Sequence, residues 1–245
     1  MIIKIDHLSL SSENFHHDID IFKNFGYSIL HQNELLENLE NKKLFLNNFH
    51  PTQKFCLLTL GNQISIEILE YKKKFYSDSY VIPHIVIPKS SKPILENTFN
   101  FKIHDSEKKP LNGLNIFQID IHTDNIEKSE NFWASFGFQK EIQSKSNILL
   151  MNFNSPFSNQ TMTIRLIENP TQNHHKYLDH IGFNCLAFIS TSIKNEKSNL
   201  ESNNILTSKI QPLQIGNTLF DIFFCKSETG EIVEIIEPVK TIHNF

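Results

Sequence analysis

Hydrophobic residues recur along the chain with two alternating periods, and the order of these periods repeats. Residues 3 to 10 alternate every second position, which predicts a strand with Ile5 and His7 on the same face. Apolar positions then recur at helical spacing from Phe15 to Phe25, and Gly26 is placed to end that helix in a left-handed conformation. Strand-like stretches follow, so the first unit reads as a strand, a helix and three strands.

This order returns twice further along the chain. The unit at 1–71 is followed, 111 residues later, by a second copy at 116–168, in which Gln118 takes the place of His7. A third copy runs from 178 to 238. We therefore expect two halves, 1–110 and 111–245, in which residues 72–110 are either a truncated unit or a linker. Prolines at 83 and 88 suggest that the strand-like piece in this segment lies at a sheet edge.

Two carboxylates interrupt the apolar closing strands of the outer units. Glu67 faces away from Ile66 and Ile68, and Glu234 faces away from its apolar neighbours in the same way. A buried carboxylate is costly unless it is paired or bound to a cation. Histidines stand at matching places near the start of the same units, within the Asp-His pairs at 6–7 and 179–180. The set His7, Glu67, His180 and Glu234 would suit one divalent ion such as Zn, Ni, Fe, Mn or Co.

Four stretches resemble the vicinal oxygen chelate superfamily, which includes glyoxalase I, bleomycin- and fosfomycin-resistance proteins and extradiol dioxygenases. They read IDHLSL at 5–10, NFWASFGF at 131–138, LDHIGF at 178–183 and SETGEIVEII at 227–236. The resemblance implies an α+β fold in which βαβββ units pair into curved mixed β-sheet cups with helices outside. It also implies that the metal ligands come from the first and last strands of paired units.

The sequence leaves the pairing of the units open. If the outer units pair, one cup holds His7, Glu67, His180 and Glu234. If neighbouring units pair, the last cup holds Gln118 and Arg165 with His180 and Glu234. An arginine has no lone pair to give to a metal, so the outer pairing provides the fuller ligand set.

Three further polar residues are candidates for substrate binding. Gln118 and His122 share one face of a predicted strand, and Arg165 is the only arginine of the chain. If Arg165 lines the cup, its guanidinium would bind a carboxylate or phosphate through two parallel hydrogen bonds, so an anionic small-molecule substrate is expected. The opposing interpretation is a salt-bridged cation on an outer strand.

Composition limits the remaining partners. The chain has 245 residues, a net charge of −4 and scattered lysines, which argues against nucleic acid. No apolar stretch approaches the roughly 18 residues of a membrane span. Its 3 cysteines lack metal-binding spacing and are expected to be reduced core thiols, so we expect a cytoplasmic protein, as a monomer or homodimer.

These observations support two hypotheses of different classes. The first is a metal-dependent lyase or isomerase that binds a small substrate through vicinal oxygens, with Glu234 or Glu67 as the general base; an extradiol-type dioxygenase is its sister option. The second is a metal-free binding or resistance protein on the same fold. Metal analysis separates the two.

Overall fold

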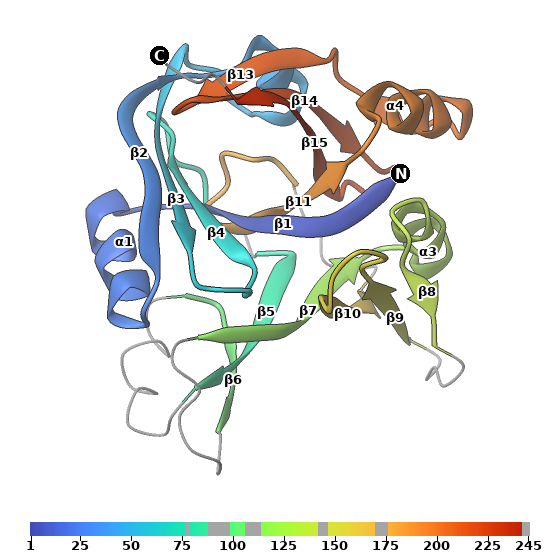
Figure 1. Ribbon diagram of the computed structural model, residues 1–245. Helices are drawn as coiled ribbons and strands as arrows, with labels where there is room; N and C mark the ends of the chain where they lie inside the picture. The colour runs from blue at the N-terminus through green and yellow to red at the C-terminus, as the bar shows by residue number, and fades with distance from the viewer. Residues whose placement is uncertain (77–78, 88–98, 106–113, 142–146, 170–175, 242–245) are drawn as a thin grey trace.

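The computed structural model describes residues 1–76, 79–87, 99–105, 114–141, 147–169 and 176–241, and within these ranges the strands form two curved sheets (Figure 1). The first sheet contains β1 (Ile2–Ser11), β2 (Ser28–Glu37), β3 (Thr52–Thr59), β4 (Ser65–Glu70), β11 (Gly182–Ser190), β12 (Leu206–Thr207), β13 (Gln211–Ile215), β14 (Thr218–Lys226) and β15 (Ile232–Thr241). The second contains β5 (Val81–Ile87), β6 (Lys102–Asp105), β7 (Asn115–Thr123), β8 (Gln139–Lys140), β9 (Ile148–Asn154) and β10 (Thr161–Glu168). The helices α1 (Phe15–Asn24), α3 (Ile126–Ala134) and α4 (Ile193–Ser202) lie outside the sheets, and the short 3₁₀ helix η1 (Glu40–Phe45) follows β2. The predicted fold class is confirmed.

Each repeat brings its first strand next to its last. β1 lies parallel to β4, β7 to β10, and β11 to β15. The same parallel contact joins β5 and β6, the two described strands of the segment that was predicted to be a truncated unit or a linker. The edge position predicted for this piece is wrong, because β5 lies between β6 and β7. Pro83 removes one N–H donor, but β5 pairs with β7 over residues 81–86 and with β6 over residues 84–87.

The outer units pair with each other. β1 runs antiparallel to β11, which joins the first and last units into one sheet, while the two middle units form the second sheet. This confirms the outer pairing and rules out the pairing of the last two units. The halves 1–110 and 111–245 do not correspond to the sheets, since each sheet takes strands from both.

A continuous apolar core fills the space between the two sheets. Leu8 and Leu10 of β1 belong to the same buried cluster as Ile119 and Ile121 of β7. A second cluster lines the interior of the first sheet, with residues from β3, β11, β14 and β15. The first sheet is therefore a cup with an apolar lining. None of the helices in the described ranges is long and apolar enough to cross a bilayer.

An irregularity in β1 decides which side chains enter the cup. The register with β11 shifts between Ile5 and Leu8, so both of these residues pack into the core between the sheets. His7 and Ser9 lie beside Glu67 in the cup instead. The predicted sharing of one face by Ile5 and His7 is wrong, because a β-bulge turns the side chains that follow it.

Candidate metal centre

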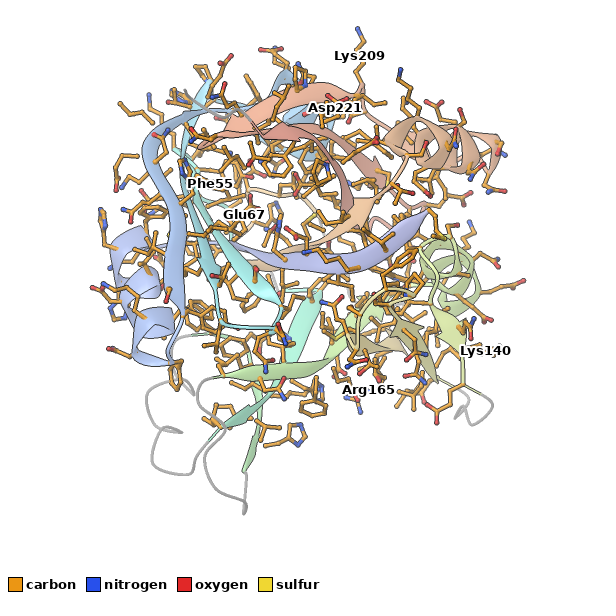
Figure 2. All side chains as sticks on the ribbon, viewed as in Figure 1. Phe55, Glu67, Lys140, Arg165, Lys209 and Asp221 are labelled. Carbon is orange, nitrogen blue, oxygen red and sulfur yellow. The ribbon has the colours of Figure 1, made fainter. Side chains whose placement is uncertain are left out.

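Three buried side chains from three strands meet inside the cup. His7 comes from β1, Glu67 from β4 and Glu234 from β15, and one possible ligand atom of each lies within 4.8 Å of the others. The side chain of Glu67 points from β4 into the space enclosed by the first sheet (Figure 2). All three residues are at most 6% exposed. The repeat places both carboxylates in closing strands, and the contact between β1 and β11 brings the two units together.

Hydrogen bonds from neighbouring residues orient the side chains of His7 and Glu67. The Nδ1 of His7 lies 3.1 Å from Oδ2 of Asp6, and Asp6 is paired with Lys4 at 3.1 Å. This contact leaves Nε2 of His7 directed at the carboxylates, 3.2 Å from Oε2 of Glu234 and 3.5 Å from Oε2 of Glu67. The Ser9 hydroxyl donates to Oε2 of Glu67 at 2.7 Å. A histidine oriented through its second nitrogen by a carboxylate is the usual support of a metal ligand.

Interactions between the charged side chains shift the pKa values of His7 and Glu67. Burial alone would lower the pKa of His7, but the carboxylates of Glu67, Asp6 and Glu234 raise it well above its ordinary value. Burial alone would raise the pKa of Glu67, but mainly His7, together with Lys42 and the Ser9 hydroxyl, lowers it to about 2. The Glu67 carboxylate is thus stabilised in the ionised form, in which it can bind a cation.

The donor set fits a divalent ion. Nε2 of His7 is buried and makes no hydrogen bond within the described chain, although two carboxylate oxygens lie within 3.5 Å of it. A buried nitrogen without a hydrogen bond is costly in a protein interior, and coordination of a cation would satisfy it. One imidazole and two carboxylates suit Zn, Ni, Fe, Mn or Co and leave coordination positions open.

His180, the fourth expected ligand, is not part of this group. β11 begins only at Gly182, so His180 precedes the strand, where its Nε2 lies 3.1 Å from Nδ2 of Asn47 and its ring stacks on Phe75. The carboxylate of Asp179 beside it accepts hydrogen bonds from the backbone amides of Asn47 and Asn48. This Asp-His pair thus anchors the segment after η1.

The register identifies Cys185 as the counterpart of His7. Ser9 lies beside Glu67, and Ala187 lies beside Glu234. Two residues before these positions stand His7 and Cys185, each eight residues before the helix of its unit. Burial and the carboxylates of Glu234 and Glu67 raise the pKa of Cys185 well above its ordinary value. This matches the expected core thiol.

The three residues expected to bind substrate lie in the second sheet, whereas Glu67 lies in the first. Figure 2 labels Arg165 and Glu67 on these two sheets. Asp120 pairs with Arg165 as Ser9 pairs with Glu67, so Arg165 stands at the counterpart of Glu67 and Gln118 at that of His7. The guanidinium binds the buried Asp120 carboxylate through Nε at 2.8 Å and through its second nitrogen. It is thus an internal ion pair.

The remaining partners of Asp120 complete this second cluster. His84 lies 2.8 Å from it, Gln118 donates to it at 3.2 Å, and Lys102 is paired with it. His122 lies on the same strand, and mainly burial lowers its pKa. None of these residues lines the cavity beside His7. Arg165, the residue that led us to expect an anionic substrate, therefore does not lie in the candidate metal centre.

Three residues that support His7, Glu67 or strand β1 were not predicted from the sequence: Asp6, Ser9 and Gln160. Asp6 and Ser9 flank His7 closely enough to have been considered, since a carboxylate or hydroxyl beside a ligand commonly orients it. Gln160, in the turn between β9 and β10, bonds to the backbone of Ile5 from the other sheet. No local pattern marks this contact.

Comparison with known proteins places the fold. No family model matches the sequence, and no curated protein matches it. Solved structures do match: a "putative dioxygenase" from Bacillus subtilis has a TM-score of 0.65 at 10% identity, covering 98% of this chain and 86% of the other. A glyoxalase I mutant from Zea mays has a TM-score of 0.60 at 12% identity, covering 96% and 93%. The chain has the fold of the vicinal oxygen chelate superfamily.

Proposed function

We propose that the protein is a metal-dependent enzyme of the glyoxalase-like type, a lyase or isomerase that holds a small substrate through two adjacent oxygens. The observation that supports this most strongly is the convergence of His7, Glu67 and Glu234, which are buried together although they come from opposite ends of the chain. Three protein ligands leave positions for substrate oxygens. A divalent ion bound there would act as a Lewis acid toward those oxygens.

The surrounding contacts assign different roles to the two carboxylates. Glu67 is fixed by the hydrogen bond from Ser9, and Lys42 lowers its pKa further. Among the residues that the structure describes, the side chain of Glu234 makes a polar contact only with His7, at 3.2 Å. A carboxylate with fewer restraints is better suited to move toward a substrate carbon and take its proton. We assign Glu234 as the general base and Glu67 as the fixed ligand.

An extradiol-type dioxygenase is the second candidate for the same site. It is favoured by the similarity in fold to the Bacillus subtilis protein, and it would use the same three residues. A metal-free binding protein remains the alternative of a different class. These options differ in what they consume: a lyase or isomerase needs no oxygen, a dioxygenase consumes it, and a binding protein needs neither oxygen nor metal.

Metal binding is the first test. Protein purified without a polyhistidine tag should bind one equivalent of a divalent ion, measured by elemental analysis and calorimetric titration. The variants His7→Ala and Glu67→Gln should lower the affinity at least about a hundredfold, because each removes a ligand. His180→Ala is the matched control and should leave the affinity within about twofold. Equal binding by all variants would contradict the proposed centre.

Turnover then separates the enzyme classes. A lyase or isomerase of this type should exchange a carbon-bound proton of an α-hydroxyketone with deuterated solvent, detected by NMR. Glu234→Gln should abolish the exchange, since an amide cannot accept that proton. Oxygen consumption with a catechol would instead identify a dioxygenase. Absence of bound metal together with absence of both reactions would favour the metal-free binding protein.

A further inference from the structure

A cavity of about 590 Å³ opens from the metal centre, and its walls indicate what the substrate carries beyond its two oxygens. Its size is that of a site for a small organic molecule. Apolar side chains from β3, β11, β13, β14 and β15 form a large part of the wall: Phe55, Leu57, Ile189, Leu213, Ile215, Phe220, Ile222 and Ile236. The substrate therefore meets hydrocarbon over much of its length.

The charges around this cavity are already matched to one another. Lys4 is the only lysine or arginine among its lining residues, and it is paired with Asp6 at 3.1 Å. Glu67 and Glu234 would together balance the charge of a divalent ion. Among the described lining residues, no lysine or arginine without a carboxylate partner remains to neutralise a carboxylate or phosphate on the part of a substrate that lies away from the metal.

Part of the rim is polar but uncharged. It is formed by residues 61–63 in the turn between β3 and β4, by Ser65 at the start of β4, and by residues 158–160 in the turn between β9 and β10. Hydroxyl and amide groups there can accept or donate hydrogen bonds to a neutral group. An ionised group against the apolar wall would lose its hydration without gaining a partner, which is strongly unfavourable.

We propose that the substrate is an uncharged molecule with a substantial apolar body, attached to the two adjacent oxygens that approach the metal. This inference rests on the proposed function, because it takes the metal end of the cavity as the reacting end. It excludes substrates whose bulk is an anionic peptide or a phosphorylated group. It also reverses the expectation of an anionic substrate, whose basis was Arg165 in the other sheet.

Hydroxamic acids test this without requiring turnover, because they chelate divalent ions through two oxygens. The protein loaded with Mn, Co or Ni would be titrated calorimetrically with acetohydroxamate, octanohydroxamate and the ω-carboxylate of the same length, suberic monohydroxamate. Octanohydroxamate should bind at least about thirtyfold more tightly than acetohydroxamate, since each buried methylene contributes about fourfold. The ω-carboxylate should bind at least about tenfold more weakly than octanohydroxamate.

A wall variant provides the matched control. Leu213→Lys places a cation inside the cavity and should reverse the preference between the two eight-carbon probes, whereas Leu206→Lys, on the exposed β12 outside the lining, should not change it. Thermal unfolding of both variants confirms that they are folded. Equal binding of the neutral and carboxylate probes, or no gain over acetohydroxamate, would overturn the substrate class alone. Hydroxamate binding that persists unchanged in His7→Ala would overturn the proposed function as well.

Discussion

A glutamine in the turn between β9 and β10 holds the part of β1 that carries the candidate ligand His7. The side chain of Gln160 accepts a hydrogen bond from the backbone N of Ile5 at 2.8 Å and donates one to its carbonyl oxygen at 2.8 Å. These bonds fall at the point where the register of β1 shifts, immediately before Asp6 and His7. We expect Gln160 to position His7 for coordination without touching the ion.

The size of the effect follows from the two hydrogen bonds. Each contributes about 1 kcal/mol net, so Gln160→Ala should lower the free energy of unfolding by about 2 kcal/mol. Coordination by His7 requires the bulge in β1 to keep its conformation. If the loss of Gln160 displaces His7, the free energy of metal binding also becomes less favourable by part of this amount. A loss of 1 to 2 kcal/mol corresponds to an affinity about fivefold to thirtyfold weaker.

Ser155 offers a control from the same hairpin. Its hydroxyl donates to the carbonyl oxygen of Ile3 on β1 at 2.6 Å, on the side of Ile5 away from His7. Ser155→Ala should therefore lower stability by about 1 kcal/mol and leave metal affinity within about twofold. The two variants would be compared by urea unfolding and calorimetric metal titration. If Gln160→Ala loses stability but binds the ion as tightly as Ser155→Ala, the positioning role is refuted.

Two buried ion pairs give further predictions. Burial would raise the pKa of Glu231, but Lys176 and neighbouring hydroxyls lower it below its ordinary 4.5, so its contribution to stability is present above pH 4.5 and is lost as the pH falls below that value. Glu231→Gln should cost about 3 kcal/mol at pH 7 and make acid unfolding, followed by circular dichroism, less steep. Arg165→Ala removes the bidentate partner of Asp120 and should cost about 1 to 2 kcal/mol in urea unfolding, because His84, Lys102 and Gln118 still contact the carboxylate. It should leave metal affinity unchanged, and a change would mean that the two sheets share one site.

The repeat could be predicted from the sequence because its parts are local. Helical spacing, a glycine that ends the helix and a carboxylate in an apolar strand are all visible within a few residues. Gly26 has a φ of +89°, as the pattern requires, and Glu67 and Glu234 are buried as expected. The sequence also placed His7 among the candidate ligands, and the structure buries it beside both carboxylates. The contact between the outer units was only favoured over its alternative, since strands far apart in sequence carry no local mark of their partner.

The bulge in β1 and the wrong position of His180 share one physical cause. The pairs Asp6-His7 and Asp179-His180 look equivalent in sequence, but register is set by pairing with the neighbouring strands, and that pairing aligns Cys185 with His7. The counterpart of His7 lies five residues after the histidine that the Asp-His pair suggests. The sequence does not reveal this difference, because apolar residues stand on both sides of the pair. Strand register depends on contacts that only the folded chain makes.

This register has a chemical consequence for the proposed centre. Cys185 stands at the counterpart of His7 but contributes no ligand atom to the group of His7, Glu67 and Glu234. The described chain then offers one nitrogen and two carboxylates, one ligand fewer than the set expected from the sequence. An ion held by three protein ligands keeps more positions for other oxygens. Because the group contains one histidine where two were expected, it favours a substrate that binds through two oxygens over one that binds through a single oxygen.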